Sequence, residues 1–293
     1  MRFRKYHALG NDYIVMGPIV TGPREEGWEP TRELVRTICH RNYGLGSDGI
    51  LWGAESAPGE PFGLRIFNPD GSEAEMSGNG VRIFARYLAD AQRVGTGEAF
   101  RIETRGGVVT AVVCDGGRRV EVDMGRVSFA SEAIPVVGWP RDVVNERMTI
   151  DGRELAFTAA TIGNPHCVIV LDEMSEAVAR RLGPAIETHQ NFPRRTNVQF
   201  MRVRDRGNIE IEIWERGAGY TLASGSSSCA AAAVAHRLGM VDRAVTVHMP
   251  GGEIGIEIGE GYAVRMSGPV TRVADGELHA EAFGCGIDSK ALY

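Results

Sequence analysis

Residues 10–15 (GNDYIV) and 77–80 (SGNG) each have a counterpart later in the chain. Residues 163–168 (GNPHCV) resemble the first stretch, and residues 224–227 (SGSS) resemble the second. Positions 11 and 77 lie 66 residues apart, and positions 164 and 224 lie 60 apart. Either match alone would be an ordinary glycine-rich turn. Both matches in the same order predict two halves of one design, related by pseudo-twofold symmetry, with a site between them.

The segments around these motifs are mostly of the strand type. Stretches that are β-branched or alternate in polarity fall at residues 108–113, 120–124, 167–171, 209–214, 245–248 and 263–266. Helical spacing is found at residues 31–41, 78–90, 175–182 and 226–238. The order of these elements predicts a mixed α/β (α+β) fold with sheets wrapped on helices, rather than alternating βαβ units.

The composition is that of a globular chain long enough for two domains. Its 293 residues are 43% hydrophobic and 24% charged, with a net charge of −6. Acidic charge and scattered basic residues disfavour nucleic acid and anionic membranes as partners, and neither a membrane span nor a secretory signal is expected. The five cysteines, odd in number and without a CxxC pair, argue against a disulfide framework and favour a cytoplasmic location.

The two Ser-Gly motifs open predicted helices, where backbone N–H groups lack partners and the helix dipole is positive. Because glycine lets an anion approach closely, residues 78–80 and 225–227 suit a carboxylate. Two such openings on one ligand would stabilise the negative charge that develops when an α-proton leaves. Ser77 and Ser224 are also preferred N-cap types. The occurrence of two openings favours the functional interpretation over simple capping.

Residues 214–219 (WERGAG) end an alternating strand and form a second candidate site. Arg216 could bind a carboxylate through two parallel hydrogen bonds. Glu215 could accept a hydrogen bond from an ammonium group or orient a base. A surface ion pair is the alternative, and the apolar Trp214 with the glycine turn that follows argues against it.

Polar turn residues form a third group of candidates. Asn11, Asn68, Asn164 and Asn197 fall in predicted turns, where asparagine is common for local reasons. Each amide also offers a donor and an acceptor to the head group of an amino acid. His166, which follows Asn164 in the repeat, could orient a group or relay a proton.

Signals for a bound cofactor are missing from the sequence. The glycine-rich residues 44–49 (GLGSDG) lack the spacing of a dinucleotide fingerprint. There is no phosphate loop, no clear metal-ligand cluster and no lysine in a cofactor-anchoring motif. The sequence therefore predicts an enzyme that works without cofactor or metal.

Six motifs, in order over nearly the whole chain, resemble the diaminopimelate epimerase family. They are residues 7–13 (HALGNDY), 67–73 (FNPDGSE), 78–80 (GNG), 163–166 (GNPH), 195–198 (RTNV) and 214–217 (WERG). The resemblance implies two pseudo-symmetric halves, each a curled mixed β-sheet or barrel around a central helix. The halves would comprise residues 1–125 plus 273–293, and residues 126–272, with the active site in the cleft between them.

The resemblance also implies an activity. Members of this family invert an α-carbon by two-base proton transfer without pyridoxal phosphate or metal, interconverting LL- and meso-diaminopimelate, a precursor of lysine and peptidoglycan. The expected partner is therefore a small amino-acid substrate, and the expected assembly is a cytoplasmic homodimer.

Site residues follow by position in the matching motifs. The reacting end of the substrate would be held by Asn11, Gly78, Asn79, Gly225 and Ser226. The distal end would be held by Asn68, Asn164, Asn197, Glu215 and Arg216. His166 and Glu215 would lie close to the acid/base pair.

At the two positions where the family has its proton-transferring cysteines, this chain has Ser77 and Ser224. A serine hydroxyl is a far weaker acid than a thiol and a poor base unless a neighbour activates it. Three explanations stay open: an introduced pair of substitutions, serines activated by neighbours such as His166 or Glu215, and divergence to another isomerisation or to ligand binding without turnover. Tyr220, where the family usually has glutamate, favours natural divergence and is expected to reshape the pocket.

Overall fold

The structure is a computed structural model that describes residues 1–21, 30–54, 56–279 and 281–282. The chain divides into two compact units, Met1–Val122 with Pro269–Tyr293 and Asp123–Gly268. The chain passes from one unit to the other within β8 (Arg119–Arg126) and at the end of β17 (Ala263–Pro269). Part of the expected first half, residues 22–29, 55, 280 and 283–293, lies outside the described residues.

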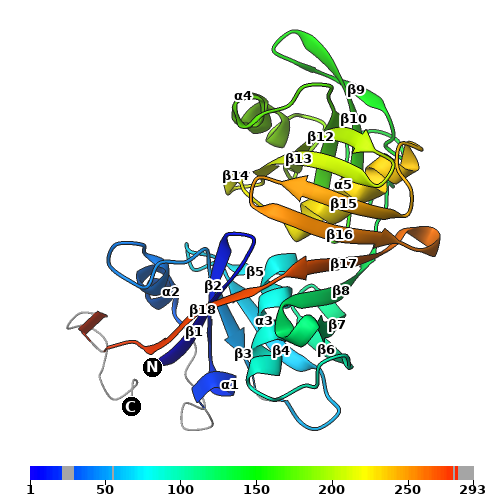
Figure 1. Cartoon of the computed structure of the whole chain (residues 1–293). Coiled ribbons are helices and arrows are strands. Elements are labelled where there is room, and N and C mark those ends of the chain that lie inside the picture. The colour runs from blue at the N-terminus through cyan, green and yellow to red at the C-terminus, as the bar shows by residue number, and fades with distance from the viewer. Residues whose placement is uncertain (22–29, 55, 280, 283–293) are drawn as a thin grey trace. The chain divides into compact units, whose positions relative to one another are not determined.

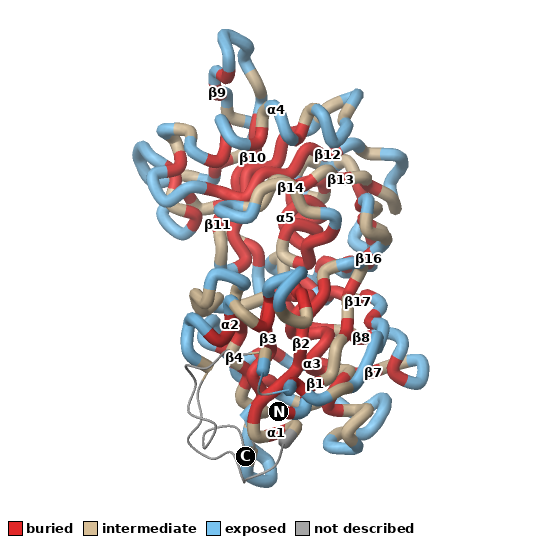
Figure 2. The backbone as a smooth tube through the Cα atoms, turned by 90° about the vertical axis from the view of Figure 1, so that its left-hand side faces the viewer, coloured by how far each residue is buried: buried red, intermediate tan, exposed pale blue. Residues whose placement is uncertain are grey.

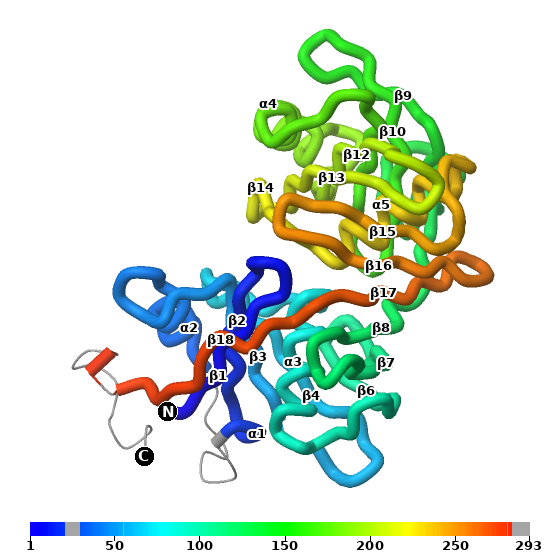
Figure 3. Tube along the Cα trace, in the orientation of Figure 1, coloured from blue at the N-terminus to red at the C-terminus, as the bar shows by residue number. Residues whose placement is uncertain are grey.

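The first unit is a mixed sheet with the neighbour order β18–β1–β2–β3–β4–β6–β7. Its strands are β1 (Arg2–Ala8), β2 (Asn11–Met16), β3 (Ile50–Gly53), β4 (Phe62–Phe67), β5 (Glu73–Ala74), β6 (Ala99–Thr104), β7 (Gly107–Cys114) and β18 (Thr271–Glu277). Its helices are α1 (Pro18–Thr21), α2 (Arg32–Cys39) and α3 (Gly78–Asp90). The last strand, β18, runs antiparallel beside the first (Figure 3).

The second unit has the order β9–β10–β11–β12–β13–β15–β16–β17. Its further strands are β9 (Glu146–Ile150), β10 (Arg153–Thr161), β11 (Pro165–Val170), β12 (Asn197–Asp205), β13 (Asn208–Glu215), β14 (Gly219–Thr221), β15 (Ala244–Met249) and β16 (Gly252–Ile258). Its helices are α4 (Glu176–Glu187) and α5 (Gly225–Arg237). Figure 1 labels these elements along the chain except β11, which Figure 2 labels.

The two units share one topology. In the first, the pairings from β1 to β7 alternate antiparallel, parallel, antiparallel, parallel and antiparallel. The pairings from β10 to β16 in the second follow the same sequence. In each unit a short strand lies just before the central helix and pairs with the strand that precedes it, β5 with β4 and β14 with β13. A 3-10 turn follows β7 and β16. The internal repeat and the mixed α+β class predicted from the sequence are confirmed.

Each unit is built around one buried helix. Helix α5 packs against β10, β11, β12, β13, β15 and β16, and α3 packs against β1, β2, β3 and β7. Figure 2 shows α5 as a mostly buried segment. Between Ala230 and Ala235, α5 has alanine everywhere except Val234, and these small side chains let strands approach on several sides. The first turn of each helix is therefore where polar groups can be presented.

The four helices predicted from the sequence are found with boundaries within two residues, except that α4 was expected to end at residue 182 but continues to Glu187. The short helix α1 was not predicted. Pro184 lies inside α4, where proline removes a hydrogen bond. Ile186 beyond it is fully buried in the second unit's core. Burial of this side chain compensates for the missing bond. No helix in the described parts of the chain is long and apolar enough to cross a membrane.

Replacing Gly183 with alanine tests the packing of α4 on β13. An added Cβ would lie 2.5 Å from Cγ and 2.7 Å from Cβ of Trp214, atoms too close to the backbone to move aside. Alanine gains about 1 kcal/mol in helix propensity, but overpacking costs about 1–3 kcal/mol, so we expect a net loss of stability in urea unfolding. Gly207→Ala, whose nearest neighbour would be 3.6 Å away, is the matched control. A more stable Gly183→Ala variant would contradict this packing.

Candidate active site

In the first unit, the start of α3 carries Ser77 as its N-cap. The Ser77 backbone is extended, with φ −139° and ψ 117°, and Oγ accepts a hydrogen bond of 3.0 Å from the Gly80 N–H. This satisfies one of the partnerless donors of the first turn. The hydroxyl of Tyr13, on β2, lies 3.2 Å from the same Oγ. Ser77 is half-buried and Tyr13 is buried.

A chain of hydrogen bonds fixes the two asparagines beside this helix start. Arg82 donates to Oδ1 of Asn79 at 2.6 Å, Nδ2 of Asn79 donates to Oδ1 of Asn11 at 3.0 Å, and Nδ2 of Asn11 donates to Asp48 at 2.9 Å. Because arginine can only donate and an ionised carboxylate can only accept, the orientation of both amides is determined. Arg82 and Asp48 were not foreseen from the sequence, yet they set how Asn11 and Asn79 face a ligand.

The start of β2 is held by a second charged cluster. Asp12 is paired with Lys5 at 2.8 Å and with Arg41 at 3.0 Å, and Arg41 also binds Asp48 at 2.6 Å. Burial raises the pKa of the Asp12 carboxyl, but its hydrogen bonds to Lys5 and Arg41 outweigh this and hold the pKa below its ordinary value. Asp12 therefore stays ionised at neutral pH and keeps the start of β2, with Asn11, against residues 41–48.

Asn68 is not joined to this group. Its Nδ2 donates to Ser72 Oγ at 3.0 Å, and backbone bonds with Gly71 and Ser72 close a local turn after β4. Among the described residues, the hydrogen bonds of its side chain remain within that turn. The predicted ligand contact of Asn68 stays a prediction.

In the second unit, Ser224 occupies the N-cap of α5 with nearly the same backbone, φ −146° and ψ 126°. Within the described residues its side chain makes no cap hydrogen bond. Nδ2 of Asn164 reaches Ser226 Oγ at 3.4 Å, so the Asn164–Ser226 contact repeats the Asn11–Asn79 contact of the first unit. Each candidate serine is thus accompanied by an amide from its own Gly-Asn turn.

His166 is completely buried behind Asn164. Its Nε2 lies 2.9 Å from Oδ1 of Asn164. Burial lowers the pKa of His166 to about 3, against the opposing effect of the nearby Gln199 side chain and together with the charge of Arg216. Gln199 in turn donates to Ser227 in the first turn of α5 at 2.9 Å. The imidazole is neutral at physiological pH and oriented toward Asn164, and its predicted catalytic role stays a prediction.

The turn after β13 is tied down through Asn197. Oδ1 of Asn197 accepts from the backbone N–H of Arg216 at 2.9 Å, and its Nδ2 donates to the Pro165 carbonyl at 2.9 Å. The Arg216 side chain is exposed. Within the described residues it makes one hydrogen bond, in which Nη1 donates to the Arg194 carbonyl at 3.3 Å. The Glu215 carboxylate accepts from Thr221 at 3.3 Å. The guanidinium of Arg216 is therefore available to an external anion.

A buried carboxylate that the sequence did not reveal supports the same turn. Glu187, at the end of α4, accepts from the Trp214 indole at 2.7 Å and from the Gly217 N–H at 3.0 Å, and it pairs with Arg195 at 3.3 Å. Only 6% of Glu187 is exposed. A signal was present, because Glu187 lies eight residues after the buried Ala179 on the same helix face.

Tyr220 faces away from Glu215. Tyr220 pairs with Trp214 across β13 and β14, whereas Glu215 pairs with Gly219, and successive side chains in a strand point to opposite faces. The Tyr220 hydroxyl donates to Glu212 at 2.7 Å, and the Arg180 guanidinium of α4 lies 4.5 Å from the ring centre. Its contacts give no support to the expectation that Tyr220 reshapes the pocket at Glu215.

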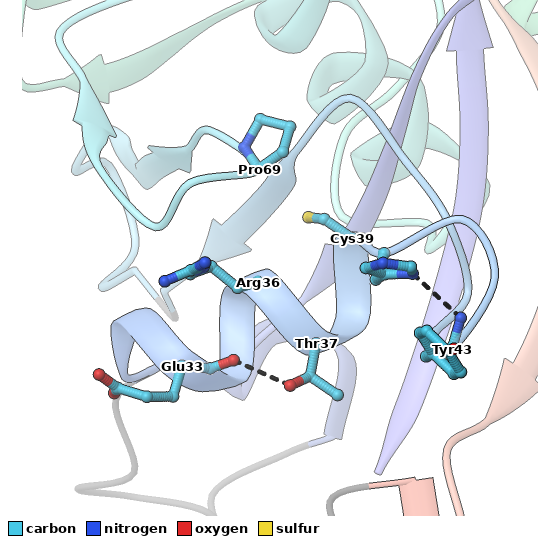
Figure 4. Close-up of a pocket in the computed structure, with 7 residues that line it drawn as sticks. Glu33, Arg36, Thr37, Cys39, Tyr43 and Pro69 are labelled. Carbon is cyan, nitrogen blue, oxygen red and sulfur yellow. Dashed lines mark hydrogen bonds between the residues drawn. The ribbon is translucent and has the colours of Figure 1, made fainter.

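A surface hollow on α2 is separate from these groups (Figure 4). It is lined by Glu33, Arg36, Thr37, Cys39, His40, Tyr43 and Pro69. None of the residues predicted for the site is among them. We therefore do not count this hollow as part of the candidate site.

Comparison with known proteins gives a consistent result. The family model described as "Diaminopimelate epimerase" matches residues 3–130 and 158–273. The "Diaminopimelate epimerase 2" of Nostoc sp. is 55% identical over 97% of both chains. The diaminopimelate epimerase of Desulfitobacterium hafniense is 41% identical over 96% of this chain and 99% of its own.

Solved structures share the fold at low identity. A probable proline racemase from Agrobacterium radiobacter has a TM-score of 0.69 at 15% identity, covering 97% of this chain and 94% of its own. A hydroxyproline epimerase from Agrobacterium vitis has a TM-score of 0.68 at 15% identity, covering 97% of both chains. These likenesses concern the fold alone.

The buried His166 predicts an acid-sensitive stability. Between pH 6.5 and about 3 the unfolded imidazole binds a proton that the folded one does not, so stability falls as pH falls. The slope from this group approaches ~1.4 kcal/mol per pH unit. We expect His166→Gln to reduce the slope of unfolding free energy against pH in this window. The same change at the exposed His279 should leave it unaltered, and equal slopes in both variants would refute the assignment.

Proposed function

Because the chain belongs to the diaminopimelate epimerase family of isomerases, we propose that it interconverts LL- and meso-diaminopimelate by moving a proton at one α-carbon. Proton transfer would occur at Ser77 and Ser224, with one helix start contributed by each unit. The supporting observation is the repeated arrangement in which a serine N-cap is accompanied by an amide from a Gly-Asn turn.

The reacting end of the substrate is assigned to the two first turns. The N–H groups at Gly78 and Asn79, and at Gly225 and Ser226, would bind the α-carboxylate. As the α-proton leaves, negative charge spreads into this carboxylate, and helix N-termini stabilise it most at that point. Asn11 would contribute its oriented amide, fixed by Asp48.

The distal amino-carboxylate end is assigned to the turn after β13. Arg216 would bind the carboxylate and Glu215 the ammonium group, with Asn68 completing the contacts. Both amide atoms of Asn197 already bind backbone groups, so its role would be to hold the Arg216 turn in place. Asn164 would contact the ligand with its orientation set by neutral His166.

The rest of the proposal follows from the family. The reaction would need neither metal nor cofactor, because the helix starts provide the charge stabilisation. We also propose a cytoplasmic homodimer that acts on a small molecule, with no nucleic-acid or membrane partner. Ligand binding without turnover, or a different proton shift on the same scaffold, is the second candidate, because serine stands at both proton-transfer positions.

Exchange in deuterated water tests the proposal. Each diaminopimelate stereoisomer is incubated with the protein, and the products are analysed by mass spectrometry and chiral separation. We expect one deuterium at an α-carbon together with inversion, and a rate increase of several orders of magnitude in the Ser77→Cys, Ser224→Cys variant, because a thiol near pKa 8.5 is the better acid and base. Absence of exchange in both proteins would mean that diaminopimelate is not the substrate.

Removal of the Arg216 guanidinium tests the distal site. A charge-assisted bidentate pair contributes about 1.5–3 kcal/mol, so Arg216→Ala should weaken diaminopimelate binding by about 10- to 100-fold or more. Isothermal titration calorimetry measures this directly. Arg206→Ala, which removes an exposed arginine paired with Asp242, is the control. Unchanged affinity in Arg216→Ala would place the distal carboxylate elsewhere.

A further inference from the structure

Tyr13 distinguishes the two units. In the internal repeat, Tyr13 and His166 both stand two residues after the asparagine of a Gly-Asn turn. The Tyr13 hydroxyl is within 3.2 Å of Ser77 Oγ. His166 instead bonds Asn164, and Ser224 makes no side-chain cap bond among the described residues. The two candidate proton-transfer serines therefore have different environments.

The Tyr13 ring is held firmly in this position. It lies on β2, and its cross-strand partner on β1 is Tyr6. Only 7% of Tyr13 is exposed. Gly49 makes room for it, because a Cβ at that position would lie 2.7 Å from Cε1 of the ring. Packing against the backbone therefore fixes the position from which the Tyr13 hydroxyl reaches Ser77.

The hydrogen-bond capacity of Ser77 allows the Tyr13 phenol to donate to it. A serine hydroxyl has one proton to donate and two lone pairs that accept. The Gly80 N–H occupies one lone pair of Ser77 Oγ. If the Tyr13 phenol donates to the other, the proton of Ser77 is directed to a ligand, and the phenol stands ready to replace it.

We propose that Tyr13 is the proton-transfer partner of Ser77, an inference that rests on the proposed function. When Ser77 acts as acid, its O–H bond breaks as a C–H bond forms at the carbanion. The phenolic proton moves to Ser77 Oγ at the same time, which leaves a Tyr13 phenolate. In the reverse direction Ser77 Oγ takes the α-proton and passes its own proton to the phenolate, and the electron pair of the C–H bond remains on the substrate.

This pairing gives the first unit a phenol, which is a stronger acid than a serine hydroxyl alone. A model tyrosine titrates near pKa 10, and an alkyl hydroxyl needs an adjacent base to act. The phenol thereby compensates in part for the thiol that the family has at this position. Tyr13 then assists proton transfer only on the face of the α-carbon that Ser77 serves, so the two proton transfers are unequal.

A purely structural role for Tyr13 is the competing explanation. Tyr6, the cross-strand neighbour, donates its hydroxyl to Asp90 at 3.0 Å, at the other end of α3. The two tyrosines thus anchor opposite ends of one helix. Tyr6→Phe is therefore a matched control that removes a buried hydroxyl from the same unit without touching Ser77.

The test is a mutant cycle read by deuterium exchange into diaminopimelate. General acid–base groups contribute about 10²- to 10⁴-fold, so Tyr13→Phe should slow exchange at least about 100-fold, and Tyr6→Phe should leave the rate near wild type. In a Ser77→Cys background, Tyr13→Phe should change the rate by less than about threefold, because the thiol needs no phenol. Both variants are compared by thermal unfolding to show that they fold.

Each outcome decides one question. A Tyr13→Phe rate equal to wild type, or an equal loss in the Ser77 and Cys backgrounds, overturns the proton-transfer role. Exchange by the Ser77→Cys, Ser224→Cys variant with none by wild type overturns it too, while leaving the diaminopimelate site intact. No exchange by either protein instead refutes the proposed function.

Discussion

A helix enclosed by strands can meet solvent only at its ends, and this constraint organises both units. Helices α3 and α5 are buried along most of their length. Their side chains are therefore mostly small, apolar or hydrogen-bonded, and the polar chemistry collects at the first turn. Glycine at the first helical position keeps the N–H groups there accessible. The strands, the turns and the candidate serines are all placed by this arrangement.

The two units use different chemistry to hold the amide side chains beside their central helices. In the first, ionised groups at both ends, Arg82 and Asp48, fix the amides of Asn79 and Asn11. In the second, the support is neutral, through His166 and Gln199. The position in α5 that corresponds to Arg82 is the buried Cys229. Identical topology has thus been retained while the polar interior has diverged.

The sequence predicted the topology well because the repeat carries both the turns and the helix starts, which are local features. The predicted start of α3 is confirmed, and that of α5 differs by one residue. Asp48 and Glu187 were missed because their partners are distant in the chain. Arg82 was missed because its burial depends on tertiary packing, although its partner Asn79 lies only three residues earlier. The orientation of Tyr220 could have been predicted from strand alternation with Trp214, but only once the β13–β14 register was known.

The cap bond at Ser77 bears on the choice between serine and cysteine at this position. Serine is among the best N-cap residues, whereas sulfur is a weak acceptor, and here Ser77 Oγ binds the Gly80 N–H. A stable helix start and thiol reactivity therefore make opposite demands on the residue at this position. At Ser224, where the described residues include no such side-chain bond, that trade-off is absent. A hydroxyl in place of a thiol thus adds a helix-cap bond at residue 77 and, within the described residues, no side-chain cap bond at residue 224.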